Sequence, residues 1–380
     1  MTSADVSKAA ELLSAREHAR VESLARHSIA VIEANQAPSG AYIACPNFPV
    51  YRYSWLRDGS FVADAMSRIG RFGSADAFFR WCADVIVARA LHIEHLVLRH
   101  ERGEAIATKE FLPCRYTADG EDSPEEWWEF QLDGYGMWLW AADQHASRAG
   151  ESLEPYARAL DLTTRYLTAF WSTPCYDWWE ENADHRHTST LAAIHAGLTA
   201  AMAWEFLESE RREAAAAAAD AIRAIVLGEG IHASRLAKWL GGDTLDASLI
   251  SCATPFRLFE PTDPLVVQTV GALELGLAHG GVHRYAADTY FGGGEWLLLA
   301  ALLGWYYAEV GRVDDACAQL NWVAAQAHAN GDLPEQSRVH LLAPEFEQRW
   351  IDCWGPVATP LLWSHAMFLT LAAELGLGAV

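Results

Sequence analysis

Five short stretches of the sequence place carboxylates, arginines and tryptophans close together. They read YRYSWLRDGSF (51–61), EEWWEFQLDGYGMWLW (125–140), YDWWEEN (176–182), RYAADTYFGGGEW (284–296) and LPEQ (333–336). Carboxyl groups can donate or accept a proton during a reaction, and arginine and aspartate side chains can bind hydroxyl groups. Tryptophan adds flat apolar faces. The combination is typical of a site for acid–base chemistry on a neutral, hydroxyl-rich molecule.

Glu180 is the first candidate for a general acid. It directly follows Trp178 and Trp179, and apolar neighbours disfavour the charged form of a carboxyl group, which raises its pKa. Glu335, in a loop bounded by glycine and proline, is a second candidate carboxyl group. Each stretch alone also has a simpler explanation, such as Asp58 capping a helix or an acidic pair on a solvated face. Together, two carboxyl groups, hydroxyl-binding residues and many tryptophans indicate glycoside hydrolysis.

The composition indicates a globular protein with a large core. Of 380 residues, 51% are apolar and 21% are charged, which rules out a disordered or fibrous chain. The formal net charge of −22 opposes binding to nucleic acid or to anionic membranes but not to neutral sugars. The seven cysteines form no CxxC pair, so a disulfide framework is not expected. Because no signal-peptide pattern or long apolar run occurs, we expect a soluble, cytoplasmic protein.

Helical periodicity dominates the elements that must position these residues. Helices are predicted over 3–34, 59–70, 73–99, 133–149, 152–172, 187–208, 211–227, 262–279, 293–311, 313–330 and 360–376, with shorter helical pieces near 231–240 and 245–250. About twelve helices in antiparallel hairpins can bury their apolar stripes in a closed double ring. An open solenoid is the alternative, but the sequence lacks the fixed repeat of a solenoid. We expect an all-α fold with one catalytic domain over 1–380.

The five chemical stretches fall in or beside long loops between these helices. The loops cover 40–58, 107–131, 173–187, 281–294 and 331–359. Loops on a rigid scaffold commonly carry binding and catalytic residues. A closed ring of helices could bring all five loops together at one of its ends, which predicts a single site.

The residues of these stretches, and their order along the chain, resemble the motifs of glycoside hydrolase family 15, the glucoamylase family. YSWLRDGSF resembles the WxRD segment of that family, WWEFQLDGYG its W…QxDGxG segment, and YDWWEEN its DxWEE segment. RYAADTYFGGGEW resembles its RYxxDTYxxGxxW segment, and LPEQ with the later PLLWSHA resembles the segment of the general base. The resemblance covers about residues 38–370. It implies an (α/α)6 barrel and hydrolysis with inversion.

The resemblance also implies a role for ten residues. Glu180 would be the general acid and Glu335 the general base. The remaining residues would bind the sugar: Arg57, Asp58 and Arg284 through its hydroxyl groups, Tyr51 near the reacting carbon, Trp55, Trp127 and Trp363 as pocket walls, and Glu181 in the next subsite. Trp178 stands where the family has a smaller aliphatic residue, so we expect it to narrow the leaving-group side.

The expected substrate is a short α-glucoside rather than a polymer. The chain has no room for an N-terminal β-sandwich or a starch-binding module, and it shows no export signal. The resemblance favours α-1,6-linked disaccharides such as isomaltose, with β-glucose as product. The alternatives are a glucoamylase for α-1,4-linked malto-oligosaccharides, a trehalase or phosphorylase on the same fold, and a non-catalytic sugar-binding protein.

A metalloenzyme is a further alternative, based on LHIEHLVLRH (91–100). Zinc-binding histidine pairs on a helix favour a spacing of four residues, but His92 and His95 are three apart. We therefore interpret His92, Glu94, His95 and His100 as a solvated helix face. The predicted reaction needs no metal and no organic cofactor.

Overall fold

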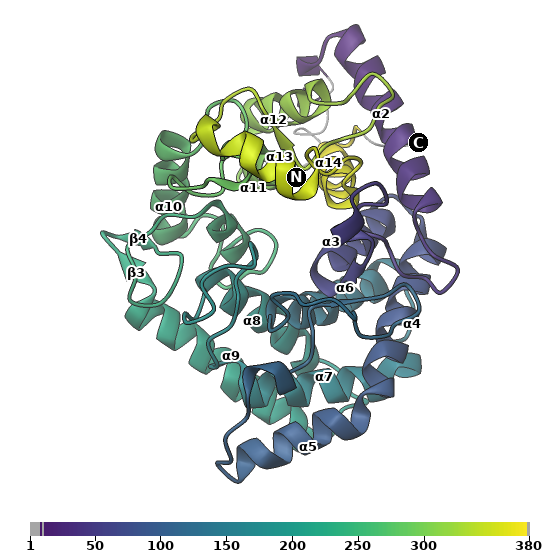
Figure 1. Ribbon diagram of the computed structural model, residues 1–380, viewed down its shortest axis with the longest axis vertical. Helices are drawn as coiled ribbons and strands as arrows, with labels where there is room; N and C mark the ends of the chain where they lie inside the picture. The colour runs from purple at the N-terminus through teal and green to yellow at the C-terminus, as the bar shows by residue number, and fades with distance from the viewer. Residues whose placement is uncertain (1–7, 10, 378–380) are drawn as a thin grey trace.

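The computed structural model describes residues 8, 9 and 11–377, and it forms two concentric rings of helices (Figure 1). The inner ring contains α3 (Leu56–Arg68), α6 (Asp133–Ala149), α8 (Thr188–Met202), the 3₁₀ helix η4 (Ala247–Cys252), α11 (Leu297–Glu309) and α14 (Leu362–Glu374). The outer ring contains α2 (Ala15–Ala34), α4 (Phe72–Ala88), α7 (Ala157–Phe170), α9 (Ser209–Glu229), α10 (Pro264–Gly276) and α12 (Val313–Ala325). The chain alternates between the rings, and α14 closes the inner ring against α3. The predicted (α/α)6 architecture is confirmed.

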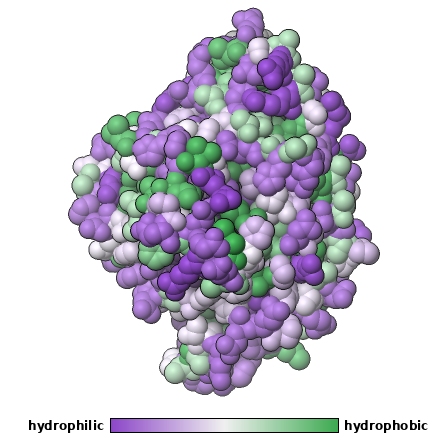
Figure 2. All heavy atoms as spheres, turned by 45° about the horizontal axis from the view of Figure 1, so that its top comes forward, coloured by the Kyte–Doolittle hydropathy of each residue, from purple (hydrophilic) through white to green (hydrophobic). Residues whose placement is uncertain are grey.

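The two rings differ in how much of each helix is buried. In α11, whose sequence is LLLAALLGWYYAE, twelve of thirteen residues are buried because neighbours cover it on all sides. In α9 only five of 21 residues are buried: Ala215, Ala218, Ala219, Ile222 and Val226. These five recur at the three- and four-residue spacing of a one-sided apolar stripe. Figure 2 shows the outside of this arrangement, where hydrophilic residues cover most of the visible face.

Two additional helices lie outside the alternating rings. The helix predicted over 73–99 is in fact two, because α4 ends before Arg89 and α5 (Ala90–Glu101) follows. The Arg89 side chain donates to the carbonyl oxygens of Val85 and Gly120 at this break. Helix α13 (Glu347–Trp354) was not predicted. Short 3₁₀ segments also lie in the loops: η1 (Pro49–Tyr51), η2 (Thr108–Glu110), η3 (Glu154–Tyr156) before α7, η5 (Tyr290–Gly292) and η6 (Pro344–Phe346) directly before α13.

The structure contains three two-stranded antiparallel sheets. Two of them pair loops that are distant in sequence, and the third is a short hairpin. They are β1 (Ser54–Trp55) with β2 (Arg115–Tyr116), β3 (Ile231–His232) with β4 (Arg235–Leu236), and β5 (Glu295–Trp296) with β6 (Gln336–Ser337). The prediction of a helical piece near 231–240 is therefore wrong. Ala233 and Ser234 both have positive φ, which produces a tight hairpin turn instead of a helix. Near 245–250 the helical prediction holds as η4.

The described part of the chain covers most of the predicted N-terminal helix. Of the helix predicted over 3–34, residues 3–7 and 10 lie outside the described part, and α2 begins at Ala15 with Ser14 as its capping residue. Among the described residues, no helix combines the length and the apolarity of a membrane span. All seven cysteines are free thiols.

Close packing of α6 against α8 generates a stability prediction. A Cβ atom on Gly136 would lie 2.4 Å from the carbonyl oxygen of Ala193, so Gly136→Ala should force the two inner helices apart and destabilise the fold by about 1–3 kcal/mol. Gly271 in α10 has no neighbour within 4 Å of its Cβ position, so the control Gly271→Ala should stabilise the fold by up to about 1 kcal/mol. Urea unfolding followed by tryptophan fluorescence measures both. Equal midpoints for Gly136→Ala and wild type would contradict this packing.

Candidate active site

All ten residues predicted for the site line one cavity. They are Tyr51, Trp55, Arg57, Asp58, Trp127, Glu180, Glu181, Arg284, Glu335 and Trp363. Several stand at the first turn of an inner helix or just before it: Trp55 precedes α3, Asp58 lies in the first turn of α3, and Trp363 lies in the first turn of α14. The cavity therefore lies at the N-terminal ends of the inner helices. These ends carry partial positive charge, which favours carboxylates nearby.

A tight turn of the chain holds Glu180 in the cavity. Glu180 has a φ of 64°, a left-handed conformation that costs a non-glycine residue roughly 1–2 kcal/mol. The side chain of Asp177 stabilises the turn, because its Oδ1 accepts the backbone N–H groups of Trp179 and Glu181, both at 2.9 Å. The Glu180 N–H itself donates to the carbonyl oxygen of Asp177 at 3.0 Å. The surrounding bonds thus fix a strained residue at the position from which its carboxyl group reaches the cavity.

The surroundings of the Glu180 carboxyl group are more polar than the sequence argument assumed. Its Oε1 accepts the indole N–H of Trp55 at 2.9 Å and the amide of Gln131 at 3.1 Å, and Arg57 Nη2 lies at 3.5 Å. Of the two tryptophans that precede it, Trp178 packs against Phe61 and Trp363, and Trp179 donates its indole N–H to Asp246. The donors from Trp55, Gln131 and Arg57 all reach Oε1, so the geometry leaves Oε2 as the oxygen that can carry and deliver a proton.

Glu335 is the more deeply buried of the two candidate carboxyl groups, with 2% of its surface exposed. Burial raises its pKa to about 8, and nearby Arg284 and the hydroxyl of Tyr51 only partly oppose this effect. Its backbone is fixed on both sides, because its N–H donates to the carbonyl of Ala358 and its own carbonyl accepts the N–H of Leu297. The hydroxyl groups of Tyr51 and Tyr290 lie 2.9 Å apart beside this carboxyl group.

Arg57 binds protein carboxylates and an amide rather than forming a two-pronged pair with Asp58. Its Nη1 donates to Gln131 Oε1 at 2.6 Å and to Asp133 Oδ2 at 3.1 Å. The Nε of Arg57 is 3.6 Å from Asp58 Oδ2, which is too long for a good hydrogen bond. Burial raises the pKa of Asp58 to about 7, although Arg57 lowers it. Asp58 therefore keeps hydrogen-bonding capacity for a ligand in the cavity.

Arg284 is held by Asp288 and by aromatic rings. Its Nε and Nη2 donate to the two Asp288 oxygens at 2.7 and 2.5 Å, and Nη2 lies 3.5 Å from Glu181 Oε1. The glycine run that follows allows close approach of two loops. A Cβ atom on Gly294 would lie 2.3 Å from the carbonyl oxygen of Ser337 in the loop over 331–359. The glycine run is thus a packing device.

Sequence reasoning missed several aromatic residues of the cavity. The additional rings are Phe48, Trp128, Trp179, Tyr290, Trp296, Trp350 and Trp354, and Trp178, which the sequence did single out, also lines the cavity. Trp350 and Trp354 belong to α13, the helix that was not predicted inside the loop over 331–359. Their spacing of four residues places both on one face of that helix, and this spacing is the signal that could have found them. Whether Trp178 narrows the leaving-group side stays a prediction.

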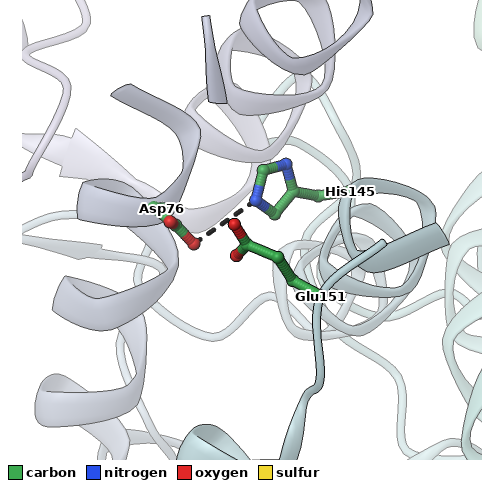
Figure 3. Close-up of side chains that lie close together, drawn as sticks. All are labelled: Asp76, His145 and Glu151. Carbon is green, nitrogen blue, oxygen red and sulfur yellow. Dashed lines mark hydrogen bonds and ion pairs between the residues drawn. The ribbon is translucent and has the colours of Figure 1, made fainter. Parts of the chain in front are cut away.

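The histidine-rich helix α5 does not form a metal-binding group. His92 and His95 are exposed, and Glu94 pairs with Arg158. Within the described residues, Asp76, His145 and Glu151 form the only group of three side chains close enough to share an ion (Figure 3). His145 Nε2 lies 3.3 Å from Asp76 Oδ1, and its Nδ1 lies 3.0 Å from Ser67 Oγ. Both ring nitrogens thus have protein partners at the contact between α4 and α6, away from the cavity.

Comparison with known proteins assigns the chain to a family. The family model described as "Glycosyl hydrolases family 15" matches residues 19–253. The chain belongs to glycosyl hydrolase family 15. Isomaltose glucohydrolase from Kribbella flavida is 49% identical to this chain over 368 residues, which cover 96% of each chain.

Two solved structures extend the comparison to three dimensions. A glycosidase variant in complex with glucose superposes with a TM-score of 0.94 at 48% identity, over 96% of this chain and 99% of that one. A bacterial glucoamylase complexed with acarbose superposes with a TM-score of 0.72 at 19% identity, over 93% of this chain and 56% of that one. The second likeness concerns the fold alone. The protein is therefore a glycoside hydrolase of family 15 with the (α/α)6 barrel.

The burial of Glu335 generates a prediction for the pH dependence of stability. Its pKa is 4.5 in an exposed carboxyl group and about 8 in the fold, so between these values the folded state binds a proton that the unfolded state releases. Stability from this group is therefore lost as pH rises from about 5 to 8, by at most about 1.4 kcal/mol per pH unit. Glu335→Gln lacks this titratable group. The difference between its free energy of unfolding and that of wild type should therefore shift in favour of the variant as pH rises. Parallel pH curves for the two proteins, measured by urea unfolding, would contradict the burial.

Proposed function

We propose that this protein is an exo-acting, inverting glucosidase that releases β-glucose from short α-1,6-linked glucosides, with isomaltose as the preferred substrate. The observation that carries the proposal is the cavity in which Glu180 and Glu335, 155 residues apart in sequence, face the same space. The likeness to isomaltose glucohydrolase over nearly the whole chain supports the substrate.

The proposed reaction is a single displacement. Glu180 Oε2 gives a proton to the glycosidic oxygen while Glu335 removes a proton from a water molecule on the opposite face of the glucose ring. The C–O bond to the leaving sugar breaks as the bond to the water oxygen forms, so an α-linkage gives β-glucose. Such a mechanism needs carboxyl groups roughly 6.5–9.5 Å apart to leave room for the water.

The remaining cavity residues take supporting roles in this proposal. Asp58 and Arg284 bind hydroxyl groups of the terminal glucose, while Arg57 also holds Glu180 Oε1. Tyr51, beside Glu335, borders the developing positive charge and the attacking water. Glu181 contacts the leaving sugar. Trp55, Trp127 and Trp363 form apolar walls against which the C–H faces of the sugar pack.

Three finer predictions from the sequence remain proposals. We expect residues 1–380 to act as one catalytic domain, the substrate to be short, and the protein to work in the cytoplasm. A partner other than the sugar substrate is not needed for the reaction.

The first experiment measures linkage and stereochemistry together. Time-resolved proton NMR with isomaltose, and separately with maltose at equal concentration, should show β-glucose first and mainly from isomaltose. The β-anomer follows from one displacement at the anomeric carbon. Faster β-glucose release from maltose would replace the α-1,6 assignment by the glucoamylase alternative. Early α-glucose would contradict inversion, and glucose from neither sugar would favour another substrate or a binding protein.

The second experiment separates the two glutamates. Isomaltose needs a proton on its leaving oxygen, whereas α-glucosyl fluoride loses fluoride as an anion. Glu180→Gln should therefore lose isomaltose hydrolysis by about 10²–10⁴-fold but keep much more of its activity on the fluoride. Glu335→Gln should lose both activities, because both substrates need the activated water. If Glu180→Gln lost both equally and Glu335→Gln spared the fluoride, the roles would be reversed.

A further inference from the structure

Lys238 is a buried cation beneath the turn that carries Glu180. Its side chain is 4% exposed, and its Nζ lies 3.0 Å from Asp177 Oδ2 and 3.0 Å from Asp246 Oδ2. Both aspartates are buried as well. Because each oxygen is 3.0 Å from the same nitrogen, the two carboxylates cannot be more than about 6 Å apart. They would repel each other strongly in this low-dielectric position without the ammonium group between them.

Each of these aspartates holds a different part of the turn. Asp177 Oδ1 accepts the N–H groups of the residues on either side of Glu180. Asp246 accepts the indole N–H of Trp179 at 2.9 Å through Oδ2. Asp246 also caps η4, because its Oδ1 accepts the N–H of Ser248 at 2.8 Å. The backbone and one large ring of the turn are thus tied to the two carboxylates that Lys238 neutralises.

Lys238 also supports the neighbouring Glu181. Its Nζ lies 4.1 Å from the centre of the Tyr285 ring, and the Tyr285 hydroxyl donates to Glu181 Oε2 at 2.6 Å. The direct distance from Nζ to Glu181 Oε2 is 3.9 Å. The single ammonium group therefore contacts Asp177, Asp246 and, more weakly, the carboxylate proposed for the leaving sugar.

The backbone of Lys238 is fixed independently of its side chain. Its N–H donates to the carbonyl of Thr244 at 2.8 Å, and its carbonyl accepts the N–H of Thr188 at the start of α8. The ammonium group is thus anchored to the inner ring, and Lys238 is not among the residues that line the cavity. Burial lowers the pKa of Lys238, but Asp246 and Asp177 together raise it further, so the side chain is charged.

We propose that Lys238 is a positioning residue for the catalytic turn: it locks Asp177 and Asp246 in place, and through them it sets where Glu180 meets the glycosidic oxygen. The inference rests on the proposed role of Glu180 as general acid. Lys238 itself transfers no proton and touches no substrate. Its loss should therefore impair proton delivery to the leaving group more than the reactions that do not need that proton.

The test compares two substrates in the full-length protein. We define the acid ratio as kcat/KM for isomaltose divided by kcat/KM for α-glucosyl fluoride. Lys238→Met should lower this ratio at least about tenfold, because a shift of the turn on the ångström scale misplaces the acid. A merely structural residue would lower both activities together and leave the ratio unchanged.

A matched control exists at the far end of α6. Arg148 Nη2 lies 2.5 Å from the buried Asp64, which also pairs with Arg68, so Arg148→Met likewise removes a cation from a buried carboxylate. Arg148 is fifteen residues along the helix from Asp133, about 22 Å from the cavity end. Its variant should lose stability yet keep the wild-type acid ratio.

A second variant covers the case in which Lys238→Met does not fold. The double variant Lys238→Met/Asp246→Asn removes the negative charge of Asp246 together with the ammonium group. The amide oxygen of the new side chain can still accept the indole N–H of Trp179. Its acid ratio should lie below that of wild type. An unchanged ratio in whichever of these variants folds overturns the proposal.

Glu180→Gln distinguishes failure of this inference from failure of the proposed function. If Glu180→Gln leaves the acid ratio unchanged, the general-acid assignment itself is wrong. If Glu180→Gln lowers the ratio and Lys238→Met does not, only the role of Lys238 is wrong. A fall of the ratio in both variants, with Arg148→Met at the wild-type value, supports both.

Discussion

This structure depends on one constraint: several carboxyl groups, all negative when ionised, lie close together around one cavity. Asp58, Glu180, Glu181 and Glu335 all border one cavity in a protein of net charge −22. Unpaired carboxylates in such a place would shift their pKa or unfold the region. The (α/α)6 barrel reduces the repulsion among these carboxylates through the orientation of its inner helices. These helices begin at the cavity, so the positive ends of their dipoles lie there.

Three buried cations complete the charge balance, and none of them is interchangeable with the others. Arg57 lies among the acids at the start of α3, Arg284 is clamped by Asp288 among aromatic rings, and Lys238 sits one layer deeper between two aspartates. The planar guanidinium groups suit the positions that border flat rings, whereas the compact ammonium fits between two oxygens at 3.0 Å. The tryptophans around them exclude water, which strengthens these interactions.

The sequence was sufficient for the ring architecture and for the ten predicted residues of the cavity, but not for rings such as Trp350 and Trp354. Inner helices such as α11 are apolar on all sides, and the family motifs carry all ten site residues. It was not sufficient where the structure depends on contacts between distant segments. Lys238 looks like an ordinary surface lysine in a stretch read as helix, and only the fold brings it to Asp177. The polar surroundings of Glu180 were missed for the same reason, since Gln131 and Trp55 come from other loops.

The residues of the cavity come from two kinds of element. Arg57 and Asp58 lie in the first turn of α3, and the Glu335 backbone is hydrogen-bonded on both sides. Glu180 instead lies in a turn of a loop, and Trp350 and Trp354 come from the short helix α13. A scaffold of this kind can keep one sugar in place while loop substitutions alter the second. Under the proposed function, linkage preference depends on loop contacts, the part of the site that motif order predicts least.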